Sequence, residues 1–266
     1  MSRGSGAQLV RGRRSVVPAR VSAVVLLTLL GAGCASRKTT TPAELMLNER
    51  MAAVLLHDGK AQEAEQAYRE AARSDPKNSE VHDGLGAALL MQHKYGECVT
   101  AFDRAVKLVP EKPLYRIHRA MVLTELGRYR EAEEDLRVAE ASPLPEDHVD
   151  VNVNRGRMRQ RQGGYAAAET EFAAALAADP KSLAARMGRG VARESRGDLR
   201  AAAEDYLEAV RLDPKSPDAN LRLGLVLLTL KKTALGRRYL ERTIELDPVG
   251  EAGARARVLL ESVPSS

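Results

Sequence analysis

The sequence predicts an all-α protein, a solenoid of six stacked helix pairs followed by one closing helix. The first observation behind this prediction is a column of large apolar residues spaced 34, 34, 36, 34 and 34 positions apart: Tyr68, Phe102, Leu136, Phe172, Tyr206 and Leu240. The second is a column of small residues with the same period: Ala52, Gly86, Ala120, Gly156, Gly190 and Gly224. The third is a set of prolines that end the repeats: Pro76, Pro110, Pro180, Pro214 and Pro248. A fixed period of this length indicates a repeat array, because each unit buries its apolar face only against its neighbours.

The first repeat is expected to contain helices over residues 42–57 and 61–74. Thr41-Pro-Ala-Glu44 is typical of a helix start, with a capping box and proline at the first helical position. Gly59 ends the first helix, as Gly127, Gly163 and Gly197 do in later repeats.

The six repeats are predicted over residues 45–78, 79–112, 113–146, 149–182, 183–216 and 217–248. Ser182 and Ser216 are expected to cap the opening helices of repeats five and six. The third junction contains two extra residues and displaced prolines in 142–148, which predicts a longer loop there. Residues 249–266 are expected to form a capping helix over the exposed apolar end of the last repeat.

These columns closely resemble the tetratricopeptide repeat (TPR), a helix-turn-helix unit of 34 residues. The resemblance implies a right-handed solenoid and a protein-binding groove lined by the first helix of each repeat. By the family's geometry, the expected groove residues are Leu90, Ile117, Met121, Val153, Arg157, Arg161, Met187, Val191, Leu221, Leu225 and Leu228. An apolar groove of this kind suits an amphipathic helix or an extended apolar segment, although the same residues could instead pack against neighbouring repeats.

Residues 1–33 have the organisation of a secretory signal: five arginines without an acid, an apolar run over 21–30, and small residues before Cys34. The apolar run is shorter than the roughly 20 residues that a membrane-spanning helix needs. The pattern resembles a bacterial lipoprotein signal, in which the cysteine is acylated and becomes the new N-terminus. The resemblance implies a lipidated tether over 34–41 and, with Ala35 after the cysteine, an anchor on the periplasmic face of the outer membrane.

The composition argues for binding rather than chemistry. The chain has 41 Lys and Arg against 36 Asp and Glu, and the excess of five equals the arginines of the leader, so nothing indicates a nucleic-acid partner. The histidines have no metal-ligand spacing, and no phosphate loop or nucleophile motif occurs. We therefore expect no enzyme activity, cofactor, metal or small-molecule substrate. Cys98 occupies a column of Ala and Gly, which favours a packing role over a reactive thiol.

The opening helices of repeats four and five carry a set of arginines. Arg155 and Arg189 occupy a column that is usually apolar in this family, and Arg159 and Arg193 follow one helical turn later, in a column that holds leucine in the other repeats. The set comprises Arg155, Arg157, Arg159, Arg161, Arg186, Arg189, Arg193 and Arg196. One interpretation is internal pairing with acidic side chains: Glu169, Glu171, Glu194, Glu204 or Asp205. The other is an arginine face for an acidic partner segment or for anionic head groups, since guanidinium groups suit carboxylates and phosphates.

An array of six repeats behind a lipoprotein-like signal resembles the pilotin lipoproteins of type IV pilus systems. The resemblance implies a scaffold without turnover chemistry that binds secretin subunits and promotes their multimerisation at the outer membrane. Two alternatives remain at this point: an adaptor that recruits peptidoglycan enzymes, and a subunit of outer-membrane protein insertion.

Overall fold

The computed structural model describes residues 42–262, with side chains from Glu49 onward. The chain divides into two units, Met1–Lys38 and Thr39–Ser266, and all described residues lie in the second. The expected signal, Cys34 and its tether fall outside the described residues. Residues 42–262 form thirteen α-helices and no strand, which confirms the predicted all-α repeat fold.

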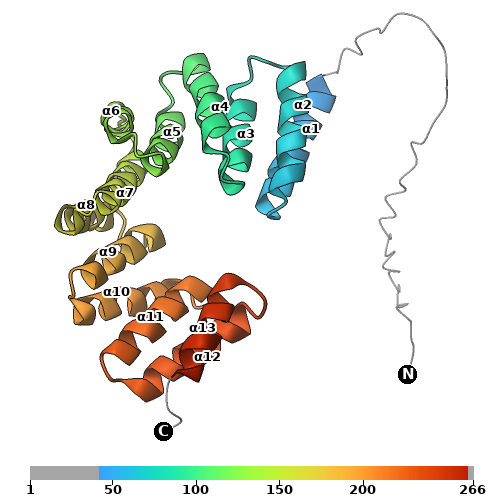
Figure 1. The fold of residues 1–266 in the computed structure, drawn as a ribbon. Coiled ribbons are helices and arrows are strands. Elements are labelled where there is room, and N and C mark those ends of the chain that lie inside the picture. The colour runs from blue at the N-terminus through green and yellow to red at the C-terminus, as the bar shows by residue number, and fades with distance from the viewer. Residues whose placement is uncertain (1–41, 263–266) are drawn as a thin grey trace, which may run out of the picture. The chain divides into compact units, whose positions relative to one another are not determined.

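The helices follow one another in antiparallel pairs, and each pair stacks on the next (Figure 1). The six pairs, here numbered as repeats one to six, are α1 (Pro42–His57) with α2 (Ala61–Ser74), α3 (Ser79–Met91) with α4 (Tyr95–Leu108), α5 (Pro113–Glu125) with α6 (Tyr129–Ala139), α7 (Pro145–Arg161) with α8 (Tyr165–Ala178), α9 (Leu183–Ser195) with α10 (Leu199–Leu212), and α11 (Pro217–Thr229) with α12 (Thr233–Leu246). A single helix, α13 (Glu251–Glu261), closes the stack against α11 and α12.

The helix starts follow from local sequence. The side chain of Asn78 accepts hydrogen bonds from the backbone N–H groups of Glu80 and Val81, at 3.0 and 3.2 Å. Ser182 and Ser216 accept from the third residue after each of them, as predicted for N-caps. These contacts satisfy backbone donors that have no partner inside the helix.

The turn inside each helix pair needs one residue in the left-handed conformation. Gly59, Gly127, Gly163 and Gly197 hold that position with φ between +72° and +85°. His93 and Lys231 occupy the same column in repeats two and six, with φ of 57° and 62°. The four glycines were predictable because glycine adopts this conformation without strain. The two exceptions were not, because only the stacked helices impose the turn there.

The third junction differs from the predicted longer loop. Helix α6 ends at Ala139, about one turn early, and α7 begins at Pro145, about one turn before the expected start at Val149. The extra residues therefore lengthen α7, and the loop itself grows little. Proline explains the shift, since Pro143 disfavours a helical conformation at Ser142, whereas Pro145 suits the first helical position.

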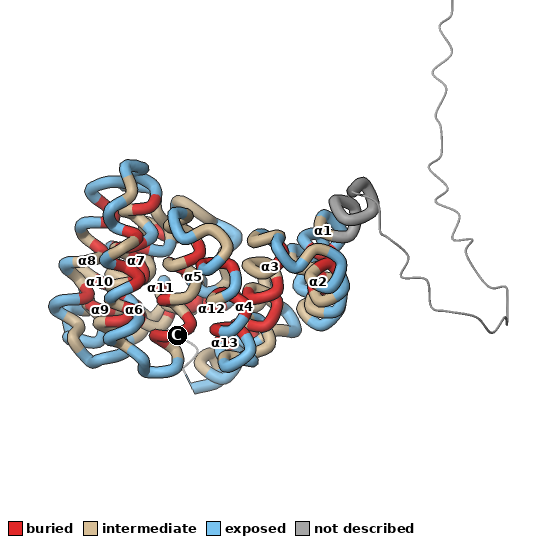
Figure 2. Tube along the Cα trace, turned by 90° about the horizontal axis from the view of Figure 1, so that it is seen from above, coloured by how far each residue is buried: buried red, intermediate tan, exposed pale blue. Residues whose placement is uncertain are grey.

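The column of large residues lies in the core, and Figure 2 shows buried positions, drawn in red, in successive helix pairs of the array. Phe172 has no exposed surface and lies against Gly156 of its own repeat and Gly188 of the next. A Cβ at Gly156 would come within 2.8 Å of the Phe172 ring, and one at Gly188 would come closer still. Small residues in these positions thus make room for the ring, which joins repeats four and five.

The first helices of successive repeats contact one another: α1 with α3, α5 with α7, and α7 with α9. Helix α13 takes the equivalent place beside α11. Ala252 and Ala256 of α13 pack with Leu221 and Leu240, and so cover the apolar end of repeat six. The first helices therefore lie side by side at these three junctions, and α13 extends the arrangement past α11.

Candidate binding surfaces

The expected groove residues divide by burial. Ile117, Val153 and Leu221 are buried, so they contribute mainly to the packing of repeats three, four and six. The other six apolar positions are half-buried: Leu90, Met121, Met187, Val191, Leu225 and Leu228. Only this second group retains side-chain surface that a partner could contact, and the groove remains a prediction that depends on it.

Contacts within the array account for part of this burial. Met187 and Val191 of α9 pack against the core around Tyr206, and Leu228 packs against the cluster of Leu221, Leu240 and α13. The capping helix thus reduces the surface that repeat six offers to a groove ligand.

Most of the arginines in repeats four and five are engaged inside the array. Arg155 Nε lies 3.0 Å from Glu133 Oε1, and Arg159 Nη2 lies 3.1 Å from the other oxygen of Glu133. Arg155 also bonds to Glu140 at 3.0 Å. Glu133 lies in α6 of the preceding repeat and Glu140 directly follows that helix, and neither was among the acids expected from sequence. The expected Glu171 is a weaker partner, 4.0 Å from Arg155.

A similar set of ion pairs occurs in repeat five, and its acids were among those expected from the sequence. Asp205 is buried and accepts from Arg189 at 2.7 Å and from Arg193 at 2.9 Å. Arg193 bridges to Glu169 of the preceding repeat at 2.8 Å, and Arg196 binds the same carboxylate. Arg193 holds the pKa of Glu169 below its usual range, and Arg196 adds to this effect.

The two arginines closest to the expected groove behave differently from each other. Arg161 forms an ion pair with Glu125 of repeat three. Arg157 is exposed and has no hydrogen bond or ion pair with any residue of the described array. Burial raises the pKa of the nearby Asp150, as does Asp147, while His118 and Arg157 act in the opposite direction. Arg157 is thus the arginine of this set that remains available to a partner's carboxylate.

Cys98 is fully buried and its thiol donates to the carbonyl oxygen of Gly86 at 3.1 Å. Burial raises its pKa to about 12, so the thiolate is scarcely populated at neutral pH. These contacts fit the packing role expected from its column.

Within residues 42–262, no group of three or more His, Cys, Asp and Glu side chains has the arrangement of a metal site. No helix in this range is long and apolar enough to cross a membrane.

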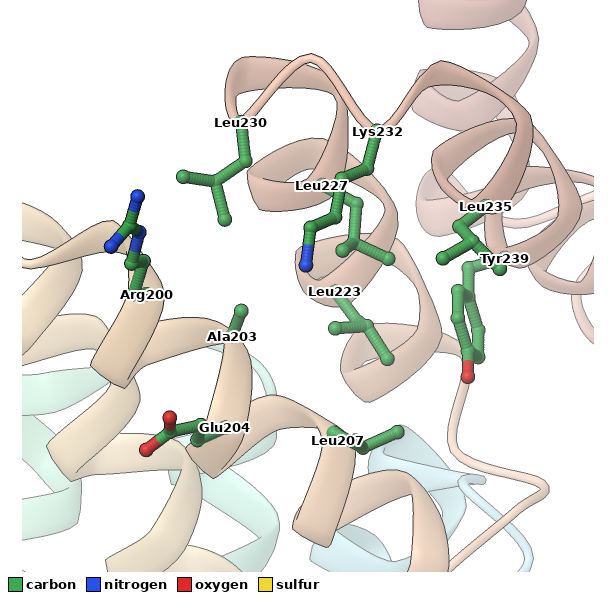
Figure 3. Close-up of a pocket in the computed structure, with 10 residues that line it drawn as sticks. All are labelled: Arg200, Ala203, Glu204, Leu207, Leu223, Leu227, Leu230, Lys232, Leu235 and Tyr239. Atoms are coloured by element: carbon green, nitrogen blue, oxygen red, sulfur yellow. The ribbon is translucent and has the colours of Figure 1, made fainter.

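The sequence prediction did not identify a pocket between repeats five and six, of about 400 Å³ (Figure 3). One wall consists of Leu223 and Leu227 of α11 and of Leu230 directly after that helix, and Leu235 and Tyr239 of α12 extend it. Helix α10 forms the opposite wall through Arg200, Ala203, Glu204 and Leu207. A comparison of the repeat columns could have located this pocket, because repeat six has leucines in the columns where repeat five has charged residues.

The pocket opens on a different face from the expected groove. Its residues on α11 are each offset by two positions from the groove residues Leu221, Leu225 and Leu228. Two residues correspond to a rotation of about 200° around an α-helix. The described array therefore has two separate candidate surfaces.

Family models for the tetratricopeptide repeat match residues 55–121, 153–217 and 192–251, together more than half of the chain. No curated protein matches the sequence. A tetratricopeptide repeat protein from Parabacteroides merdae is a similar solved structure, with TM-score 0.69, 16% identity, and coverage of 84% of this chain and 86% of that chain.

PilW, described as a widely conserved type IV pilus biogenesis factor, is similar with TM-score 0.66 and 18% identity over 83% of this chain and 100% of that chain. A chain of the APC/C hetero-tetramer Cut9–Hcn1 matches with TM-score 0.66 and 18% identity over 83% of this chain, but the match spans only 43% of that longer chain. At these identities the likenesses concern the fold. Together with the six stacked helix pairs, the matches place this chain among the tetratricopeptide-repeat proteins, whose fold is typically a non-catalytic scaffold for protein–protein interaction.

Proposed function

We propose that this protein is a lipid-anchored scaffold of the outer membrane, a pilotin that promotes assembly of the type IV pilus secretin. The observation that carries the proposal is the combination of a lipoprotein-like leader ending at Cys34 with a repeat array that begins only a few residues later. The similarity in fold to PilW over that protein's whole chain supports it.

The anchor determines where the array can act. About seven residues separate Cys34 from the first helix at Pro42, and fully extended they reach only about 25 Å. An acylated Cys34 would therefore hold repeat one close to the periplasmic face of the membrane. Secretin subunits bound to the array would be concentrated there, which favours their association with one another.

The groove formed by the first helices is the proposed secretin site. Its half-buried apolar residues, such as Met121, Val191 and Leu225, suit one apolar side of a partner helix or strand. Arg157 adds a free guanidinium for an acidic residue on the partner. No bond is made or broken in this process, because the array acts by binding and by placement.

Substitution of Cys34 tests the anchor. Cys34→Ser is expected to prevent acylation, to release the protein from outer-membrane fractions, and to lower the yield of detergent-resistant secretin multimers. Cys98→Ala is the matched control, since the column of Cys98 holds alanine in most other repeats, and it should leave both readouts unchanged. A Cys34→Ser protein that still fractionates with the outer membrane and supports full multimer formation contradicts the anchor.

Deletion of the protein separates the secretin function from its alternatives. A pilotin predicts that secretin monomers persist while multimers become scarce. Normal multimers in the deletion strain contradict the pilotin proposal and favour an adaptor that recruits peptidoglycan enzymes, or a subunit of outer-membrane protein insertion. Arg157→Glu tests the groove within the same assay, and it should weaken secretin capture most strongly at low salt.

A further inference from the structure

The pocket between repeats five and six is lined by apolar side chains, of which Leu223 and Leu227 also belong to the buried core around Tyr206. Stacking of repeats four and five uses Arg189, Arg193 and Arg196 at the positions that hold Leu223, Leu227 and Leu230 one repeat later. Those arginines bond to Asp205 and Glu169, and the two repeats remain closely packed. Charged residues at these columns are therefore compatible with the fold, and the leucines give this junction an apolar surface that its neighbour lacks.

Leu223 and Leu227 are buried at the base of the pocket, and other apolar side chains at its mouth retain exposed surface. Leu235 is 49% exposed at the mouth of the pocket, and Leu207, Leu230 and Tyr239 are half-buried around it. A concave site lined mainly by apolar side chains with a few charged groups at its edge is the usual form of a binding pocket. A volume of about 400 Å³ lies in the range of small binding pockets and admits one or two large side chains.

The charged residues at the mouth indicate what kind of ligand fits. Arg200 and Lys232 are exposed and make no ion pair with any residue that the structure describes. Figure 3 shows the Lys232 side chain directed over the leucines, with Arg200 across the pocket on α10. Glu204 lies further along α10, so the positive charges are gathered at one end. That end would attract a carboxylate, and the Glu204 end would repel one.

We propose that this pocket binds a segment of a protein partner that inserts a bulky apolar side chain between α10 and α12 and places an acidic residue against Arg200 and Lys232. The site is a second docking surface, separate from the groove on the opposite side of α11. It does not depend on the pilotin proposal, because it requires neither the lipid anchor nor a secretin.

Selection from a library of short random peptides displayed on phage tests the proposal with the purified protein. Peptides that carry a large apolar residue beside Asp or Glu should be enriched. A fluorescein-labelled copy of an enriched peptide should then bind with a Kd that rises about tenfold or more in Leu235→Asp and in Arg200→Glu, as for a central contact. Both positions are exposed, so the two variants should keep the helical content and melting temperature of the parent protein.

Val258→Asp is the matched control, because Val258 is also an exposed apolar residue, at 66% against 49% for Leu235, and lies on α13 outside the pocket. It should leave peptide binding unchanged. The proposal is overturned if no peptide is enriched, if the enriched peptides are basic, or if they bind Leu235→Asp as tightly as the parent. Sedimentation adds a further outcome: a dimer of the parent protein that Leu235→Asp dissociates would assign the pocket to a second copy of this chain and overturn the partner segment.

Discussion

The junction between repeats four and five and the junction between repeats five and six occupy the same columns with different chemistry. In the first, Arg189 and Arg193 bond to the buried carboxylate of Asp205. In the second, the corresponding positions hold Leu223, Leu227 and Tyr239, which surround an open pocket. The backbone arrangement is the same helix pair in both cases. A repeat array can therefore change the character of one junction without altering the next, because each repeat contacts only its neighbours.

The difference also concerns stability and specificity. A paired cluster of charges contributes little net stability compared with apolar packing, because its desolvation offsets its attraction. Removal of only one partner from such a cluster is nevertheless costly, because it leaves the other charges unpaired. An apolar pocket tolerates substitution at its rim but exposes surface that favours binding. The following predictions separate what the two junctions share from what distinguishes them.

The largest expected effect concerns the buried core column that both junctions share. Phe172→Ala removes a fully buried ring that lies between Gly156 and Gly188 and joins repeats four and five. Truncation of a buried aromatic residue typically costs about 3–5 kcal/mol, so the midpoint of urea unfolding should fall sharply. The damage should be centred on the neighbouring repeats, which amide hydrogen exchange can locate. Unchanged unfolding would place the core elsewhere.

A smaller effect is expected at the charged junction. Asp205→Asn leaves Arg189 and Arg193 without their shared carboxylate in a site where Asp205 itself is only 2% exposed. The arginines remain about one-fifth exposed, so we expect a loss of about 1–3 kcal/mol, less than for a fully buried charge pair. Denaturant unfolding at neutral pH measures it.

Conversion of Asp205 together with its two closest arginines provides the control for Asp205→Asn. The triple variant Arg189→Leu, Arg193→Leu and Asp205→Tyr copies the residues that the next repeat carries at these columns. Replacement of a complete buried charge cluster by apolar residues is often neutral or stabilising. The triple variant should therefore be more stable than Asp205→Asn. If the triple variant were instead the less stable of the two, apolar residues at these positions would not replace the stabilising effect of the charged cluster.

The smallest effect concerns acid. Arg193 lowers the pKa of Glu169 in the folded protein below its ordinary value of 4.5, and Arg196 contributes further. A lowered folded-state pKa stabilises the fold above the ordinary value, and this contribution is lost as the pH falls through the lowered value. Glu169→Gln should cost about 0.2–1 kcal/mol at pH 7, as expected for a largely solvated pair, and should reduce the loss of stability in acid. Ala203 holds this column in the next junction, so exchange protection there should change less with pH. If exchange protection fell equally at both junctions as the pH is lowered, the lowered pKa of Glu169 would not be what distinguishes them in acid.

The sequence by itself determined the repeat number, the class of fold and most helix limits. Periodic columns of Phe172 and its counterparts, small residues such as Gly156, and prolines between repeats act locally, so they can be read without the structure. Four of the six tight turns were predictable from glycine for the same reason. The two turns at His93 and Lys231 were not, because their conformation is imposed by helices that pack on both sides.

Only the tertiary structure decided how the side chains between repeats are used. The sequence left open whether the arginines pair internally or face a partner, because Glu133 and Glu140 come into reach of Arg155 only when α6 and α7 pack. Likewise, Arg200 and Lys232 are more than 30 positions apart but lie at the mouth of one pocket. Periodicity specifies which residues face a junction, whereas pairing and open volume depend on distances across it that only the packed helices define.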